Sequence, residues 1–286
     1  MKILENESLK KYTTVKIGGI AKKLYFPGSI EELIEIINNV KGENLYIISG
    51  GSNLLINDKK IFDEVISLRD MDTTINHLGN GKYYIGASVR LQKLIDHTNN
   101  DGYGGIEYLY SVPALVGGAV AMNAGRGKTH NLSISDYIID VHVYDCNERK
   151  QKVLKKEECN FSYRDSIFKK NNKMIVLGAN FCFDSIDKEE AKKRKRERIE
   201  LVKKVQDNSG YNFGSVFNEH NKYLMQLVRF VHPGYKGGMA FSRKTSNWLI
   251  NQGEGTYDQS CRLINKVVKI HRILGMRISL EVIMWD

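Results

Sequence analysis

The residues best suited to chemistry lie in two glycine-rich stretches. The longer is Gly102–Gly127, which from Ser111 onward carries small side chains almost continuously and no charge before Arg126. The shorter is Ser49-Gly-Gly-Ser-Asn-Leu-Leu55. A backbone without side chains can approach a flat or phosphorylated ligand closely and point several N–H groups at it. Two such stretches in one chain favour a dinucleotide ligand.

Both stretches also have an ordinary structural interpretation. The small residues after Ser111 suit the tightly packed start of a buried helix, and the paired glycines after Ser49 suit a tight turn at the end of a strand. Neither stretch is a Walker loop or a GxGxxG motif. Spacing alone therefore leaves ligand binding and packing as open alternatives.

The elements that would position the shorter stretch form a β–α–β unit. We expect a strand over residues 23–26, a helix that begins at Ser29 with Glu32 as its capping-box partner, and a strand over 45–48. The second strand opens directly into Ser49. The carboxyl ends of strands are where open α/β sheets bind phosphates.

Further strands are predicted over residues 65–68, 83–87, 139–143 and 174–183, with a short helix over 91–98. A strongly basic helix over 189–206 follows, and residues 207–210 suggest a domain boundary.

The last part of the chain is predicted to fold as its own unit. A helix over 222–231 is expected to turn four residues inward: Leu224, Leu227, Val228 and Val231. Thr256 and Gln259 predict a capping box for a second helix that ends at Gly275. A final strand is expected to bury Ile278, Leu280, Val282 and Met284, so that Glu281 points to the opposite face, solvated or directed into a site.

The composition narrows the class of protein. The net charge of +10 and pI of about 9.2 suit an anionic partner, but the basic run Lys192–Arg198 has no interleaved aromatic residues. We interpret this run as a solvated helix face and do not expect nucleic acid to bind there. The four cysteines lie far apart, and neither they nor the seven histidines show metal-ligand spacing, so no metal is expected. We see no signal peptide and no membrane span, and we expect a cytoplasmic protein.

Seven segments, in order along nearly the whole chain, resemble those of UDP-N-acetylenolpyruvoylglucosamine reductases, the MurB flavoenzymes of peptidoglycan synthesis. The segments are Thr14-Val-Lys-Ile-Gly-Gly19, Ser49–Leu55, Ser111–Gly125, Tyr163–Phe168, Phe213–Phe217, Ser242–Asn251 and Leu280-Glu281-Val282.

This resemblance implies an α+β fold: an FAD-binding fold of the vanillyl-alcohol-oxidase (PCMH) type in two subdomains, followed by a C-terminal α+β substrate domain. The corresponding boundaries are 1–70, 71–187 and 188–286. FAD would be the cofactor, and NADPH and a nucleotide-sugar would be the substrates. A monomer is expected.

The resemblance also assigns residues. It implies FAD contacts from the two glycine-rich loops: Ser49, Gly50, Gly51, Ser52, Asn53, Leu54, Ser111, Val112, Pro113, Gly117, Gly118, Ala119, Met122 and Asn123. It implies substrate contacts from Tyr163, Lys244 and Asn247, and catalytic roles for Arg164, Ser215 and Glu281.

The implied reaction explains the three catalytic residues. The enolpyruvyl group receives a hydride through the flavin, and negative charge then develops on C2 and on the carboxylate. Arg164 would grip the carboxylate in a bidentate way, and Glu281, when protonated or bridged to that arginine, would help to polarise it. Ser215 would donate the proton to C2.

This chain departs from the family at several positions. Asn218-Glu219-His220 stand where the family has Lys-Asn-Pro beside the substrate. Ser49 and Ala114 replace glycines, Thr245 replaces a histidine, and Arg126-Gly127 stand where an aromatic residue is expected. The substrate rim is therefore altered, which leaves two alternatives open: a paralogue acting on another anionic nucleotide-sugar or enol, and a non-catalytic flavin-binding regulator.

Overall fold

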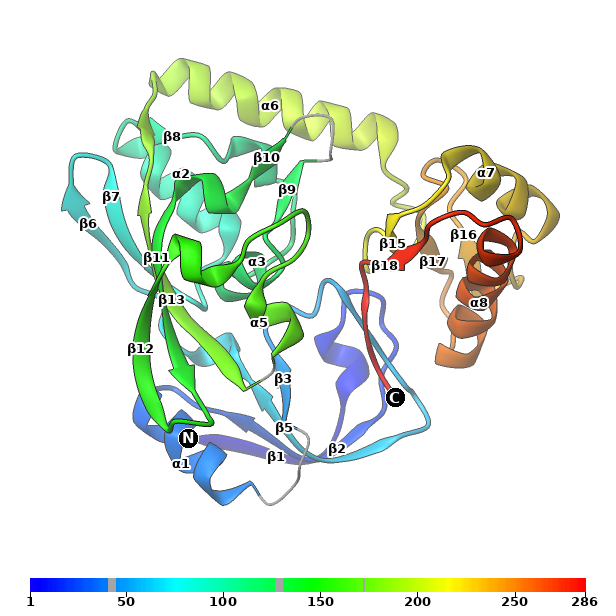
Figure 1. Cartoon of the computed structure of the whole chain (residues 1–286), viewed down its shortest axis with the longest axis horizontal. Coiled ribbons are helices and arrows are strands. Elements are labelled where there is room, and N and C mark those ends of the chain that lie inside the picture. Colours follow the sequence, from blue (N-terminus) through cyan, green and yellow to red (C-terminus); the bar gives the residue numbers. More distant parts are fainter. Residues whose placement is uncertain (41–44, 127–130, 172) are drawn as a thin grey trace. The chain divides into compact units, whose positions relative to one another are not determined.

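The computed structural model describes residues 1–40, 45–126, 131–171 and 173–286 (Figure 1). The chain divides into two compact units. Unit 1 comprises Met1–Leu4, Lys23–Gly50 and Glu64–Val202, and unit 2 comprises Glu5–Lys22, Gly51–Asp63 and Lys203–Asp286. The chain passes from unit 1 to unit 2 between Gly50 and Gly51, in the middle of the shorter glycine-rich stretch. The predicted division into three domains stays a prediction.

A four-stranded sheet with the order β1-β2-β5-β3 contains the predicted β–α–β unit. Its elements are β1 (Lys2–Ser8), β2 (Ile20–Phe26), α1 (Ile30–Asn39), β3 (Tyr46–Ile48) and β5 (Ile61–Ser67). Strands β3 and β5 are parallel. The cap differs in one detail from a capping box: Ser29 accepts the N–H of Glu32 as expected, but the Glu32 carboxylate accepts the N–H of Gly28 instead of that of Ser29.

The larger sheet of unit 1 is antiparallel and has the order β12-β11-β13-β7-β6. The strands are β6 (Ile75–Gly79), β7 (Lys82–Gly86), β11 (Ile138–Asp145), β12 (Lys150–Lys155) and β13 (Met174–Cys182). Strands β7, β11 and β13 confirm the predictions, whereas β6 and β12 were not predicted. Figure 1 shows α2 (Leu91–Asn100), α3 (Val116–Ala121) and α5 (Ile167–Lys170) on one side of the sheet. A continuous apolar core joins α2 and α3 to the strands. This core positions the longer glycine-rich stretch.

Short elements complete unit 1: β8 (Tyr103–Gly104), β9 (Gly125–Arg126), β10 (Leu132–Ser133) and β14 (Asp184–Ser185). The predicted basic helix is α6 (Lys188–Val205), and Ala191 is its one fully buried side chain. Figure 1 shows α6 running past α2, and Lys195 Nζ on α6 lies 2.6 Å from Asp96 Oδ1 on α2. Helix α6 therefore packs on unit 1 by a few long side chains rather than by an apolar face.

Unit 2 is built on helices α7 (Lys222–Val231) and α8 (Tyr257–Ile273) and the hairpin of β16 (Met239–Phe241) and β17 (Leu249–Asn251). The bounds of α7 match the prediction, but two of its four inward residues are wrong. Leu227 and Val231 are each 58% exposed, whereas Met225 is fully buried with Leu224 and Val228. The buried stripe is therefore centred on the Met225 side of the helix, because that is the side that the core of unit 2 covers.

The predicted final strand is interrupted. Strand β18 (Ser279–Leu280) pairs antiparallel with β15 (Phe217–Glu219), and β19 (Ile283–Trp285) pairs parallel with β4 (Leu54–Ile56). The chain changes sheets at Glu281-Val282, so the expected alternation fails: Leu280 is 38% exposed and Glu281 only 9%.

The cap of α8 is also simpler than predicted. Thr256 accepts the N–H of Gln259 as expected, but the Gln259 side chain accepts the N–H of Met239 on the neighbouring hairpin.

Candidate functional site

The two glycine-rich stretches meet inside unit 1. A Cβ added to Gly50 would lie 3.4 Å from Leu115 N, and one added to Gly118 would lie 3.1 Å from Ser49 Oγ. The backbones of the two loops therefore approach each other closely, with no side chain of Gly50 or Gly118 between them. Backbone bare of side chains at the meeting of two loops fits an FAD-type ligand, which needs N–H groups within close reach.

Arg69 fixes the first loop. Its Nε and Nη2 atoms donate to the carbonyl oxygens of Ser49 and Gly50, at 3.2 and 3.0 Å. Sequence reasoning missed Arg69, because a lone arginine 19 residues from the loop carries no local pattern. A guanidinium that binds two successive carbonyls holds them turned toward itself and leaves the loop in one conformation.

In the second loop, one glycine serves close packing and another faces the first loop, so both interpretations of its sequence apply. The N–H groups of Val116 and Gly117 donate to Val89 O and Ala87 O, and a Cβ on Gly117 would lie 2.9 Å from the Ala87 Cβ. Gly117 therefore serves the close packing of α3 against the chain that follows β7. Gly118 is half-buried and faces the first loop instead. The predicted FAD contacts of these residues stay predictions.

The predicted substrate and catalytic residues Tyr163 and Arg164 lie in a tight turn that is fixed to the second loop. Ser166 Oγ donates to Ala121 O at 2.6 Å, and Asn123 Nδ2 donates to Ser162 O at 2.8 Å. Arg164 has a left-handed backbone, with φ of 57°. The turn thus projects the Arg164 side chain from the same frame that holds the second loop. Asn123, predicted as a flavin contact, has the structural role of joining the two segments.

In unit 2 the structure joins the Ser215 segment to the Glu281 segment through the backbone. Ser215 forms a β-bridge with Trp248, and the N–H of Glu281 donates to the carbonyl of the adjacent Val216 at 2.8 Å. Gly214, with φ of 78° and no atom within 4 Å of an added Cβ, leaves open space before the serine. Among the described residues, no hydrogen bond is made to Ser215 Oγ. The hydroxyl is therefore available to a ligand.

The first loop also contacts the Glu281 segment within unit 2. Asn53 Nδ2 donates to Glu281 O at 3.0 Å, and Ile283 N donates to Asn53 O at 3.1 Å. Asn53, predicted as a flavin contact, thereby fixes the chain at the point where it changes sheets. This contact explains why the nearly buried Glu281 has a defined position.

Two predicted substrate residues remain, Asn247 and Lys244. The side-chain amide of Asn247 forms hydrogen bonds within the protein. Its Oδ1 accepts Phe217 N at 3.0 Å, and its Nδ2 donates to Phe217 O at 2.7 Å. Asn247 therefore holds the strand that follows Ser215. Lys244 is exposed, and its Nζ lies 3.5 Å from Lys203 O.

A buried carboxylate shapes the turn that carries Lys244. Ser242 Oγ and Arg243 N donate to Asp207 Oδ2 at 2.8 and 3.1 Å, and Ser209 N donates to Oδ1. Burial raises the pKa of Asp207, but the hydrogen bonds from Ser209, Ser242 and Arg243 outweigh it and lower the pKa from 3.8 to about 2.

This pKa predicts acid sensitivity. Because the folded-state pKa lies below the unfolded one, ionised Asp207 stabilises the fold by about 2 kcal/mol above pH 4, and the contribution is lost as the pH falls through about 2. We expect Asp207→Asn to remove this part of the pH dependence, measured by urea unfolding from pH 7 to pH 2.5. Asp63→Asn, at an 80% exposed side chain, is the control and should leave the profile unchanged. Parallel profiles for wild type and Asp207→Asn would contradict the assignment.

Gly51 gives a second prediction. Its φ is +67°, and an added Cβ would lie 1.9 Å from Tyr12 O. Gly51→Ala should therefore lower the free energy of unfolding by about 3 kcal/mol or more and reduce bound flavin, measured by urea unfolding and visible absorption. Gly79→Ala is the matched control, since Gly79 has φ of +92° but no atom within 4 Å. Equal losses of unfolding free energy in both variants would show that the close approach to Tyr12 does not contribute to the destabilisation.

The predicted substrate-binding and catalytic residues thus belong to two units. Tyr163 and Arg164 lie in unit 1, whereas Ser215, Lys244, Asn247 and Glu281 lie in unit 2. Their gathering over one flavin stays a prediction. In the ranges 1–40, 45–126, 131–171 and 173–286, no three His, Cys, Asp or Glu side chains are grouped to hold a metal ion, and no helix is both long and apolar enough to cross a bilayer.

Comparison with known proteins first identifies the class of fold. The family model of the FAD binding domain matches residues 21–153, which include both glycine-rich loops. The crystal structure of UDP-N-acetylenolpyruvylglucosamine reductase (MurB) from Thermus caldophilus superposes with a TM-score of 0.79 at 26% identity, covering 100% of this chain and 98% of that one. The fold is therefore the expected α+β fold with an FAD-binding domain of the vanillyl-alcohol-oxidase type.

Curated relatives define the family. UDP-N-acetylenolpyruvoylglucosamine reductase from Bacillus pumilus is 33% identical over 94% of this chain and 88% of its own length. The enzyme of the same name from Halalkalibacterium halodurans is 34% identical over 92% and 87%. This chain belongs to the UDP-N-acetylenolpyruvoylglucosamine reductase family, which confirms the resemblance seen in the sequence.

Proposed function

We propose that this chain is an FAD-dependent oxidoreductase that uses NADPH to reduce the enolpyruvyl ether of UDP-N-acetylglucosamine to UDP-N-acetylmuramate, a step of peptidoglycan precursor synthesis. The observation that carries the proposal is the backbone hydrogen bond that joins the Glu281 segment to the Ser215 segment in a member of this family. A hydroxyl and a nearly buried carboxyl on two joined segments suit a site that protonates a carbanion and binds a carboxylate.

FAD, held at the meeting of the two glycine-rich loops, would supply the hydride relay from NADPH to the enolpyruvyl C3. The remaining chemistry belongs to the chain. Arg164 would hold the substrate carboxylate, on which negative charge increases as C3 is reduced. The Ser215 hydroxyl would donate its proton to C2, and Glu281 would fix the orientation of the carboxylate.

The backbone supports this role of Ser215. Its strand is held on one side by Asn247 and Trp248 and on the other by the Glu281 segment. A proton donor fixed in this way requires little reorganisation when the charge develops. The open space next to Gly214 leaves room for a substrate.

A visible absorption spectrum followed by NADPH titration tests the proposal. We expect yellow protein whose NADPH oxidation is stimulated by UDP-N-acetylglucosamine enolpyruvate. Colourless protein that does not take up added FAD would refute it. Size-exclusion chromatography tests the monomer that we propose with this function.

One structural feature favours a second candidate, a reductase of another anionic nucleotide-sugar or enol. Asn218, at the altered rim, lies on β15 and accepts a hydrogen bond from Ser279 on β18. A neutral amide bound to the protein cannot offer a substrate the cation that the family has near this position. Flavin reduction by NADPH without stimulation by the usual substrate would support this candidate.

A further inference from the structure

Helix α7 of unit 2 exposes an apolar stripe on its outer face. Tyr223 and Phe230 are 80% and 86% exposed, and the exposed Leu227 and Val231 follow at the i, i+4, i+7, i+8 spacing of one helix face. The opposite face packs on the core of unit 2. A helix that is apolar on all sides is typically covered on all sides. The outer face of α7 therefore has the composition of a surface that is meant to be covered.

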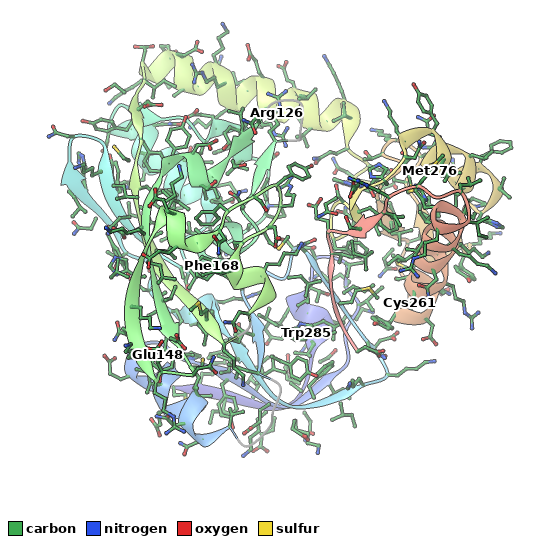
Figure 2. All side chains as sticks on the ribbon, in the orientation of Figure 1. Arg126, Glu148, Phe168, Cys261, Met276 and Trp285 are labelled. Carbon is green, nitrogen blue, oxygen red and sulfur yellow. The ribbon has the colours of Figure 1, made fainter. Side chains whose placement is uncertain are left out.

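The end of α8 adds to this surface. Ile273, Leu274 and Met276 are exposed as well, and Figure 2 shows Met276 where the chain leaves α8. His271 joins this segment to α7. Its Nε2 accepts the N–H of Asn221, the N-cap of α7, at 3.1 Å, and its carbonyl oxygen accepts the N–H of Met276 at 2.8 Å. The exposed end of α8 therefore adjoins the start of α7, where the apolar stripe begins.

The same part of unit 2 is strongly basic. Residues 220–253 and residues 259–280 each contain five Lys or Arg and no Asp or Glu, so these ten cations equal the net charge of the whole chain. Six of the ten are exposed and have no carboxylate of the described chain within 4.0 Å: Lys222, Lys236, Lys266, Lys269, Arg272 and Arg277. The positive charge on this surface is therefore not compensated from within the described chain.

The cations lie next to the apolar residues. Lys266, Lys269 and Ile273 follow one outward stripe of α8. Lys266 Nζ lies 3.4 Å from Nδ1 of His232, the C-cap of α7. Since the end of α8 meets the start of α7 and the middle of α8 meets its end, the two helices run antiparallel. The basic stripe of α8 therefore runs alongside α7.

We propose that the outer face of α7, together with the end of α8, docks on the surface of a membrane that contains anionic phospholipids. Apolar side chains flanked by Lys and Arg are typical of protein surfaces that lie in the headgroup region of a bilayer. The apolar side chains enter the acyl boundary, and the cations meet the lipid phosphates. This inference goes beyond the proposed function, because it concerns where the reaction takes place and not which reaction it is.

Other partners fit this face less well. Two copies of the chain docked through it would bring the same uncompensated cations together, and that repulsion opposes a dimer. A nucleic acid would match the charge, but most of the exposed apolar side chains are aliphatic, and bases stack on aromatic ones. A bilayer matches the charge and the aliphatic side chains together.

Vesicle co-sedimentation with the flavin-loaded full chain tests the proposal. Vesicles of phosphatidylcholine with about one third phosphatidylglycerol should bind the wild type at least roughly 10-fold more tightly than pure phosphatidylcholine vesicles. The double variant Leu227→Gln/Phe230→Gln should weaken binding by roughly 10- to 100-fold, because it removes two apolar side chains from the bilayer. Lys266→Gln/Lys269→Gln should weaken it by roughly 10-fold, because it removes two cations from the lipid phosphates.

Two control variants make the same chemical changes elsewhere. Leu78→Gln/Val153→Gln replaces two apolar residues of the larger sheet of unit 1, each more than half exposed. Lys192→Gln/Lys193→Gln removes the same formal charge from α6. Both controls should bind the anionic vesicles as the wild type does. The proposal is overturned if the wild type does not bind these vesicles, or if a control variant is impaired as much as its counterpart.

Further measurements separate this surface from the reductase site and from other partners. Leu227→Gln/Phe230→Gln should keep the thermal midpoint and the NADPH oxidation of the wild type in solution. A loss of that activity would show that the two side chains serve the reductase site and would overturn the assignment. Single-stranded RNA that displaces the vesicles, or a dimer that this variant converts to a monomer, would also overturn it. If the wild type binds as expected but has no reductase activity, the proposed function fails and this inference stands.

Discussion

Ser215→Ala will slow product formation by about 100- to 10,000-fold, the range that a positioned proton donor contributes, while NADPH reduces the bound flavin at nearly the wild-type rate. The reason is that the hydroxyl acts only after hydride has reached the substrate. Stopped-flow measurement of the two half-reactions separates these steps.

The structure makes this variant a clean test. Ser215 forms a β-bridge with Trp248, the N–H of the next residue, Val216, donates to Asn247 O, and in the described part of the chain the Ser215 hydroxyl makes no hydrogen bond. Alanine should therefore leave the fold intact, which an unchanged flavin spectrum and thermal midpoint would verify. Equal loss of both half-reactions would contradict a role as proton donor.

Arg164→Gln should lower kcat/KM for the enolpyruvyl substrate by about 100- to 1,000-fold, which is typical for removal of one preorganised group that stabilises developing charge. Arg164→Lys keeps the charge but loses the bidentate fork, so its activity should be intermediate. Steady-state kinetics with both variants measures the effect, and flavin reduction by NADPH serves as the internal reference.

The matched control is Arg149→Gln. Arg149 is an exposed arginine of unit 1 with a left-handed backbone, φ of 52°, like the 57° of Arg164. It has no predicted role in the reaction, so its replacement should leave kcat/KM unchanged. A loss in Arg149→Gln as large as that in Arg164→Gln would trace the effect to the backbone conformation and not to the guanidinium.

The family, the fold class and most elements could be predicted from the sequence. Strands such as β11 and helices such as α2 and α7 follow from short-range periodicity, which is a property of consecutive residues. The order of motifs was sufficient for the family, because seven segments in the right order are a far more specific signal than any single loop.

Local patterns failed wherever a distant partner decided the outcome. The capping boxes at Ser29 and Thr256 formed only in part, because Glu32 and Gln259 bind Gly28 and Met239 instead. The alternation predicted around Leu280 failed because the chain changes partner strands at that point. Periodicity gives the spacing of apolar residues but not the identity of the surface that covers them.

The sequence by itself determined the two bare loops, the hydroxyl and the charged groups that the chemistry needs, since these depend only on residue type and order. Only the tertiary structure decided that Arg69 fixes the first loop, that the Asn247 amide binds the backbone of Phe217, and that Arg198 binds Ser111. The physical reason is that hydrogen bonds and charge interactions depend on distance in space, and residues far apart in the chain leave no periodic trace of their approach.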